Sequence, residues 1–103
     1  MDENVLKDAM QLIFYAGNAK SQAMQAIEAA EHHDFDLAKK MIKDARSELS
    51  QSHQIQTTMM QDELNGKEIE KSILLIHSQD HFMSASLCCD LAEKLIYVHE
   101  KIK

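Results

Sequence analysis

The helical character of this 103-residue chain is clearest in Leu74-Leu75-Ile76-His77-Ser78-Gln79-Asp80-His81-Phe82-Met83. The apolar residues of this stretch are typical of a buried helix, yet two histidines and an aspartate interrupt them. A titratable group on an apolar surface needs a partner, a proton or a chemical role. This stretch is therefore the first place to look for a functional site.

Asp80 continues an apolar stripe whose members are three or four residues apart. The stripe consists of Ile69, Ile73, Ile76, Asp80, Met83 and Leu87. A second apolar stripe in the same segment consists of Leu75, Phe82, Cys89, Ala92 and Ile96. A helix with more than one apolar face is covered on more than one side. Two other helices of the same chain can cover only part of this one, so we expect it also to pack against other copies of the protein.

The rest of the sequence predicts two more long helices. The chain has no proline, only two glycines, and 45% hydrophobic residues, which favours long helices and one small domain. We predict helices at about residues 4–31, 35–64 and 67–102 of a single domain, residues 1–103. Because long helices joined by short connections run antiparallel, the predicted fold is an all-α, up-down-up three-helix bundle.

Helix ends and core-facing stripes can also be predicted. Asp34 is a suitable N-cap for the second helix, and Asn65-Gly66 is suited to end it. The second helix is expected to bury Phe35, Ala38, Ile42, Ala45, Leu49, Ser52, Gln56 and Met59. The expected stripe of the first helix is Leu6, Met10, Ile13, Gly17, Lys20, Met24 and Ile27, widened by apolar neighbours such as Phe14 and Ala23, with a close helix crossing at Gly17. The polar group of His53, Gln56 and Thr57 is expected to form a hydrogen-bonding contact with the start of the third helix.

The composition argues against several functions. A net charge of −6 with neutral histidines is unfavourable for nucleic acid, because phosphate contacts need lysine and arginine. No apolar run approaches the ~20 residues of a membrane-spanning helix, and the N-terminus does not resemble a signal peptide. The adjacent Cys88 and Cys89 are poor disulfide partners, which suggests a reducing compartment. We therefore expect a cytoplasmic protein without nucleic-acid binding or membrane insertion.

The histidines and the aspartate each allow more than one interpretation. His77 and His81 are four residues apart and share a face beside the Asp80 stripe. A neutral imidazole can accept a phosphoryl group, bind a metal or transfer a proton. One alternative is a metal-binding helical bundle in which His77, Asp80 and His81 bind one ion per chain, and another is a purely structural oligomerisation module. Copies of Asp80 in an oligomer can share protons or bind a cation, whereas a solvated or lysine-paired Asp80 does neither.

The same stretch closely resembles the signature of the enzyme IIA components of the lactose/cellobiose (N,N′-diacetylchitobiose) sugar phosphotransferase system. Three further segments match that family, namely Ala16-Gly17-Asn18-Ala19-Lys20-Ser21, Asp34-Phe35 with Ala38, and His53 with Ile55-Gln56-Thr57. The resemblance covers roughly residues 12–102. The chain departs from the family at His33, where glycine is usual, at Ser78, where alanine is usual, and at Phe82, where leucine is usual. The first departure affects a connection, and the other two are expected to adjust the partner surface beside the site.

The resemblance implies a fold, a function and a set of site residues. It implies a homotrimer of three-helix subunits, acting as a cytoplasmic phosphocarrier between the phosphocarrier HPr and the IIB component. The IIC membrane permease then takes up a β-linked disaccharide of the cellobiose, lactose or chitobiose class. By motif position, His77 is the phosphorylated residue, with His81 and Gln79 in supporting roles, and no organic cofactor is implied. Three copies of Asp80 hold Mg²⁺ or another divalent cation on the trimer axis. Neither the sugar, the phosphorylated nitrogen, the cation nor the cognate IIB is specified by the sequence.

Overall fold

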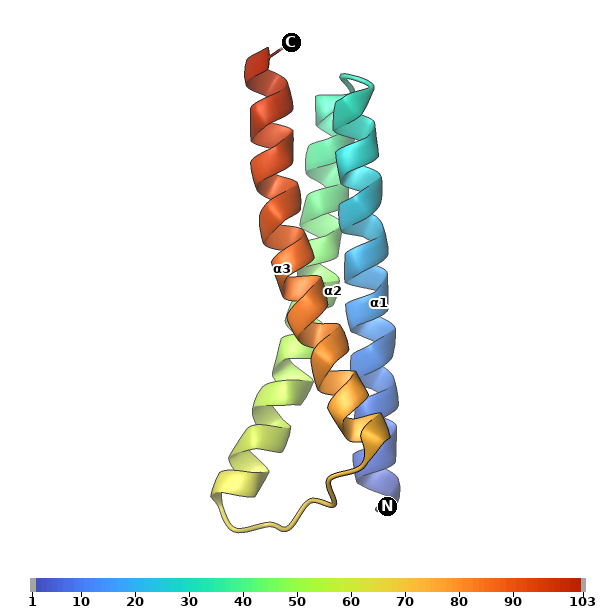
Figure 1. The fold of residues 1–103 in the computed structure, drawn as a ribbon, viewed down its shortest axis with the longest axis vertical. Helices are drawn as coiled ribbons and strands as arrows, with labels where there is room; N and C mark the ends of the chain where they lie inside the picture. The colour runs from blue at the N-terminus through green and yellow to red at the C-terminus, as the bar shows by residue number, and fades with distance from the viewer. Residues whose placement is uncertain (1, 103) are drawn as a thin grey trace.

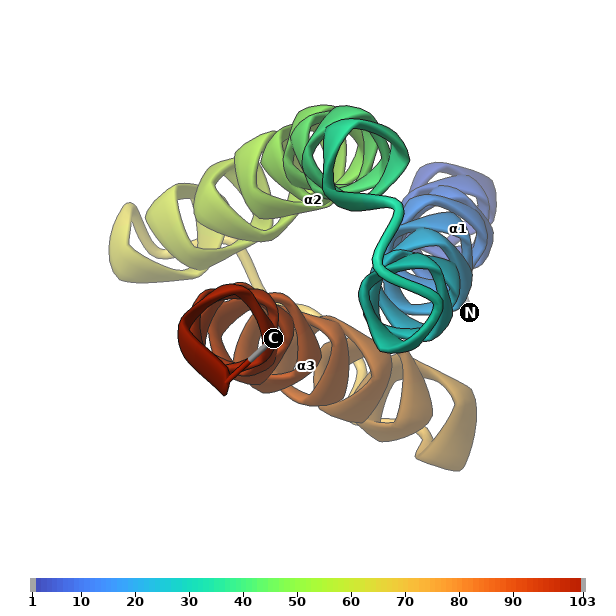
Figure 2. The same ribbon diagram turned by 90° about the horizontal axis from the view of Figure 1, so that it is seen from above.

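The computed structural model describes residues 2–102, which form three α-helices and no strand. The helices are α1 (Glu3–Glu31), α2 (Phe35–Leu64) and α3 (Ile73–Ile102). They run up, down and up in an elongated bundle of 52 × 19 × 18 Å, so that α1 and α3 start at the same end (Figure 1). The view from above shows the three helices arranged as a triangle (Figure 2). The predicted up-down-up bundle is confirmed, and none of the described helices is both long and apolar enough to cross a membrane.

The turn between α1 and α2 requires one residue with a left-handed backbone. The backbone N–H of Asp34 donates to the carbonyl of Ala29 at 2.9 Å, and that of His33 donates to the carbonyl of Ala30 at 3.0 Å. This pair of bonds is a Schellman motif. His33 occupies its left-handed position with φ 62°, which favours glycine. Asp34 then caps α2 as predicted, because its carboxylate accepts the N–H of Leu37 at 3.2 Å.

The core-facing stripe of α1 differs from the predicted one. Its buried residues are mostly alanines, in the series Val5, Ala9, Leu12, Ala16, Ala19, Ala23, Ala26 and Ala30. The predicted stripe lies beside this series, and it leaves Leu6, Met10 and Met24 between 41% and 54% exposed. The prediction was wrong because it ranked the helix faces by side-chain size. Alanines let the neighbouring helices approach α1 closely enough to pack without voids.

Gly17 does not lie at a close helix crossing within the chain. Apart from its two chain neighbours and the backbone of its own helical turns, a Cβ atom added at this position would have no described heavy atom within 4 Å. Gly17 follows the fully buried Ala16 but lies on the flank of α1 beside the alanine stripe. The expectation that a neighbouring helix of the same chain packs against Gly17 was therefore wrong.

The core-facing stripes of α2 and α3 follow the predictions. The buried residues of α2 are Ala38, Ala45, Leu49, Ser52 and Met59, and the other predicted members are half-buried. The buried residues of α3 are Leu75, Ser78, Phe82, Ala85, Cys89, Ala92 and Ile96. The Asp80 stripe of α3 is uncovered, since Ile73, Ile76, Met83 and Leu87 are between 59% and 87% exposed. One face of α3 therefore packs on the core, and no part of the described chain covers the other.

The third helix begins at Ile73, whereas the sequence pattern predicted a start at about Lys67. α2 ends as expected at Asn65-Gly66, where Gly66 has a φ of 91°. The backbone N–H of Lys67 donates to the carbonyl of Asp62 at 3.0 Å and closes a second Schellman motif. The following residues have no regular secondary structure up to Ile73.

Two features hold this connection in a non-helical path. Ile69 packs partly buried against the core, and Lys71 forms an ion pair with Glu63 of α2. The hydroxyl of Ser72 accepts the backbone N–H of Leu75 at 3.1 Å, as an N-cap does. The prediction was wrong because Ile69 fits the periodic stripe although it lies outside the helix. Ser72 directly before an apolar run was the signal for the true start.

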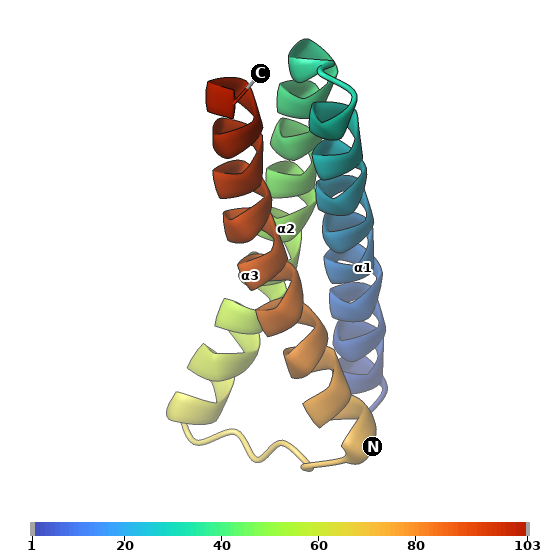
Figure 3. The same cartoon turned by 45° about the horizontal axis from the view of Figure 1, so that its top comes forward.

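α2 and α3 diverge toward this connection (Figure 3). Farther from it, Arg46 of α2 forms ion pairs with Asp90 at 2.7 Å and with Glu93 at 2.5 Å. Lys39 forms an ion pair with Glu100 at 2.9 Å near the opposite end of the bundle. The divergence leaves the first turns of α3 open on the side that faces α2.

Candidate functional site

His77 and His81 form a hydrogen-bonded pair on the surface of α3. Their Nε2 atoms are 3.0 Å apart. The two rings meet edge to face, with centroids 4.5 Å apart and an interplanar angle of 85°. His77 is exposed and His81 is half-buried. Because one neutral ring must donate an N–H and the other must accept it, the pair fixes opposite roles for the two Nε2 atoms.

Buried neighbours hold this turn of α3 in place. Ser78 is fully buried, and its hydroxyl donates to the carbonyl of Leu75 at 2.6 Å. Phe82 is 8% exposed, and the ring of His53 from α2 stacks on it at a centroid distance of 5.6 Å. Ser78 and Phe82 are two of the three departures from the family pattern. Since both side chains point into the core, they set the packing behind the site and do not adjust the partner surface directly.

Asp80 lies on the uncovered apolar stripe of α3, between Ile76 and Met83. The side chain is exposed, and it forms no hydrogen bond or ion pair with any other residue from 2 to 102. A carboxylate in an apolar stripe is favourable only where water or a cation meets it.

The described residues provide no metal site within one chain. No group of three or more histidine, cysteine, aspartate or glutamate residues between positions 2 and 102 is arranged to hold an ion. The Nε2 atoms of His77 and His81 are bonded to each other instead. The alternative in which His77, Asp80 and His81 bind one ion per chain therefore has no support in this structure.

The structure places Gln79 on a different side of α3 from His77. Two residues along an α-helix are separated by a rotation of about 200°. The carboxamide of Gln79 faces α2, where its Oε1 accepts a hydrogen bond from Nε2 of Gln56 at 3.1 Å. Its own Nε2 lies 3.9 Å from the sulfur of Met59. Within one chain, His81 therefore accompanies His77, and Gln79 does not.

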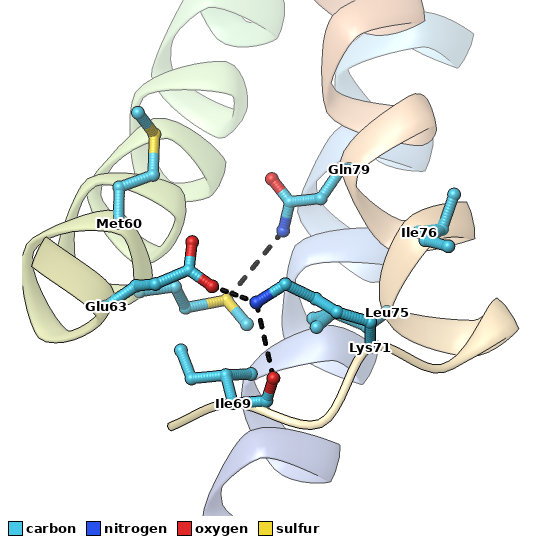
Figure 4. A pocket seen from close by; sticks show the side chains of 8 residues that line it. Met60, Glu63, Ile69, Lys71, Leu75, Ile76 and Gln79 are labelled. Carbon is cyan, nitrogen blue, oxygen red and sulfur yellow. Dashed lines mark hydrogen bonds and ion pairs between the residues drawn. The ribbon is translucent and has the colours of Figure 1, made fainter. Parts of the chain in front are cut away.

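Gln79 lines a cavity of about 200 Å³ between the diverging ends of α2 and α3 (Figure 4). The other lining residues are Met59, Met60, Glu63, Ile69, Lys71, Leu75 and Ile76. Most of this lining is apolar, and the ion pair of Lys71 with Glu63 crosses it. The sequence indicated the contact of Gln56 with α3. It gave no sign of the cavity, because the cavity depends on the non-helical path of residues 67–72.

The buried thiol of Cys89 does not add a reactive group to the site. Cys88 and Cys89 are both free thiols, and Cys89 is fully buried. Burial raises the pKa of the Cys89 thiol to about 11 because it disfavours the thiolate. The protonated thiol is a poor nucleophile, so Cys89 does not compete with the accessible imidazole of His77.

An accessible imidazole on a rigid helical bundle, held by a second imidazole, suits a protein that carries a group on a histidine. The chain belongs to the lactose/cellobiose-specific IIA subunits of the phosphotransferase system, whose family model matches residues 7–100. It is thus a component of a phosphotransferase, as the sequence signature indicated.

Relatives and solved structures agree with this assignment. The chain is 40% identical over 102 residues to the lichenan-specific phosphotransferase enzyme IIA component of Bacillus subtilis, covering 99% of this chain and 93% of the relative. The crystal structure of the cellobiose-specific enzyme IIA of Bacillus anthracis superimposes with a TM-score of 0.95 at 34% identity, covering 99% and 94% of the two chains. The IIA(chitobiose) of Escherichia coli, solved in complex with HPr, superimposes with a TM-score of 0.83 at 32% identity, covering 99% and 98%.

Proposed function

We propose that His77 accepts a phosphoryl group from phospho-HPr and passes it to the IIB component of the same system. The observation that carries this proposal is the His77–His81 pair, in which the exposed ring is His77 and the half-buried ring supports it. The likeness to a IIA protein solved together with HPr supports HPr as the donor.

The chemistry moves one phosphoryl group between two nitrogens. A lone pair of a His77 ring nitrogen forms a bond to phosphorus while the bond from phosphorus to the HPr histidine breaks. The HPr histidine keeps the electron pair of the broken bond, so the transfer exchanges one phosphoramidate for another and is nearly balanced. The protein has to position the ring and to supply donors to the phosphoryl oxygens. When the Nε2–H of His81 no longer bonds to His77, it can donate to one of those oxygens.

We propose a homotrimer because the described chain leaves the Asp80 stripe of α3 uncovered. Three parallel copies of α3 would bury Ile73, Ile76, Met83 and Leu87 around one axis. Around the helix, His77 lies to one side of this stripe and Gln79 lies to the other. In a threefold arrangement, the His77 flank of one copy therefore faces the Gln79 flank of the next. In this geometry, Gln79 of a neighbouring subunit would lie beside His77.

The same arrangement would bring three Asp80 side chains together on the axis. Unpaired carboxylates at close range repel each other unless they share protons or bind a cation. Carboxylate oxygens suit a hard divalent cation such as Mg²⁺, and Asp80 has no cationic partner among residues 2–102. We propose that such a cation neutralises the three side chains. Its role would be structural, since Asp80 is not part of the imidazole pair.

The proposed partners define the place of the protein in sugar uptake. HPr supplies the phosphoryl group, IIB receives it, and the IIC permease takes up a β-linked disaccharide of the cellobiose, lactose or chitobiose class. The site would work in the cytoplasm, where HPr and IIB meet it. The net charge of −6 favours docking to partners with basic surfaces around their own sites.

A phosphate chase tests the proposed function. Phosphoenolpyruvate, enzyme I and HPr should label the protein with acid-labile phosphate, and the label should leave when unlabelled IIB is added. The variant His77→Ala should acquire no label. Label that enters the chain but does not move to IIB would contradict the carrier role. A monomer in ultracentrifugation at micromolar protein would contradict the proposed trimer.

A further inference from the structure

The carboxamides of Gln56 and Gln79 are paired across the gap between α2 and α3. Nε2 of Gln56 donates to Oε1 of Gln79 at 3.1 Å, and both side chains are half-buried. Figure 4 shows the carboxamide of Gln79 reaching from α3 into the cavity, with its nitrogen directed toward Met59. α2 and α3 diverge toward residues 65–72 (Figure 3), and Gln79 lines the cavity between their diverging ends.

This pairing decides which end of the Gln79 carboxamide is free to bind something else. A carboxamide has one oxygen that accepts and one NH₂ group with two N–H donors. The oxygen of Gln79 is occupied by Gln56. Among residues 2–102, its NH₂ group faces only the sulfur of Met59 at 3.9 Å, and a thioether is a weak acceptor. Gln79 is therefore presented as a donor.

The orientation matters for a phosphoryl group. The oxygens of a phosphoryl group accept hydrogen bonds and carry negative charge, so an N–H stabilises them and a carbonyl oxygen repels them. The two ends of a carboxamide have nearly the same shape, so packing alone selects weakly between them. A donor on α2 that bonds to the oxygen of Gln79 selects the orientation in which the N–H groups are available.

We propose that Gln56 is a positioning residue for phosphoryl transfer. It fixes the carboxamide of Gln79 so that Nε2, and not Oε1, is offered to the phosphoryl group on His77 of the adjacent copy. Gln56 touches neither the phosphoryl group nor His77 and acts only through Gln79. This inference rests on the proposed function and on the trimer in which the Gln79 flank faces His77.

A donor–acceptor exchange at position 56 tests the inference. The ammonium of Gln56→Lys can only donate, so it keeps Oε1 of Gln79 bound and Nε2 free. The carboxylate of Gln56→Glu can only accept, so it binds Nε2 and turns Oε1 toward the site. Transfer from phospho-HPr should keep its kcat within about threefold in Gln56→Lys and lose about 100-fold in Gln56→Glu, the lower end of the cost of one lost donor. The KM for phospho-HPr should change by less than threefold in both.

Matched variants separate this effect from charge and from stability. Gln51 lies exposed on the same helix, so Gln51→Glu and Gln51→Lys make the same charge changes away from the pair and should transfer as the unmodified protein does. In a Gln79→Ala background, Gln56→Glu and Gln56→Lys should transfer at equal rates. Equal rates with Gln79 present, or a difference that persists without it, would overturn the inference.

A measurement on the unmodified protein covers the case in which a variant folds poorly. Phosphorylation of His77 should shift the side-chain N–H resonances of Gln79 in an NMR spectrum of the labelled protein. The N–H resonances of Gln51 should not move. Phosphorylated protein with unchanged Gln79 resonances would overturn the inference while leaving the proposed function intact. Protein that acquires no phosphate at all would overturn both.

Discussion

Replacing Gly17 with alanine should stabilise the chain. Glycine in a helix interior is about 0.8–1.0 kcal/mol less favourable than alanine, partly because it has more freedom in the unfolded chain. Beyond its own helical turns, the added Cβ atom would meet no described heavy atom within 4 Å, so no clash within the chain opposes the gain. The expected increase in the free energy of unfolding is about 1 kcal/mol. For a domain of this size, that corresponds to a rise of about 4–8 °C in Tm.

The neighbouring residue provides the matched control. Ala16 is fully buried in the alanine stripe, so Ala16→Gly loses the same helix propensity and also a buried methyl group. The expected loss is about 1.5–2 kcal/mol. Urea unfolding followed by circular dichroism, at two protein concentrations, measures both variants. A less stable Gly17→Ala would refute the reasoning, because it would mean that an atom packs against Gly17. A loss that depends on protein concentration would place that atom in another copy of the chain.

Three further predictions concern the turn, the buried thiol and the stripe of α3. His33→Gly should raise the free energy of unfolding by up to about 1 kcal/mol, because it removes the left-handed strain at φ 62°. A lower Tm in calorimetry would contradict this prediction and show that the contact of His33 with Phe35 outweighs that strain. The pKa of Cys89 is raised from 9.0 to about 11, so the folded state binds more protons than the unfolded state between these pH values. The contribution of Cys89 to the free energy of unfolding is therefore complete below pH 9 and falls as the pH rises toward 11. Over the same pH range, the free energy of unfolding of Cys89→Ala in urea should fall by about 2–3 kcal/mol less than that of the unmodified protein. Equal falls in the two proteins would contradict the raised pKa of Cys89. Asp80→Leu should give an oligomer of equal or greater thermal stability, since replacing clustered charge by apolar side chains is often favourable. Dissociation of this variant into unfolded monomers in ultracentrifugation would contradict the prediction.

The helices that the sequence predicted best are those with large side chains on the core face. The core face of α2 could be predicted directly from the sequence, because the large side chains of Ile42, Leu49 and Met59 lie on it. In α1 the large residues mark an outer flank, and the core face consists mainly of alanines. Hydrophobic size therefore selected the wrong face, although the alanines recur with the period of a helix. Only the packed bundle shows that α1 lies close to both of its neighbours.

The start of α3 and the position of Gln79 show the limits of a one-dimensional pattern. Ile69 continues the stripe of α3 in sequence, but it packs from an extended connection. Spacing correctly placed His77 and His81 on one face, since four residues make about one helical turn. It could not show that Gln79 pairs with Gln56, because that contact depends on the register between α2 and α3. The resemblance grouped Gln79 with His77, and the two side chains can meet only between copies.

The most direct test of the account is the position of the phosphate in the chain. The protein should be phosphorylated by phosphoenolpyruvate, enzyme I and HPr, digested at neutral or alkaline pH, and analysed by tandem mass spectrometry. We expect one phosphoryl group per chain, on the peptide that contains His77, with fragment ions that place it at His77 and not at His81. Phosphate found on His81, on His53 or on any other residue would contradict the account.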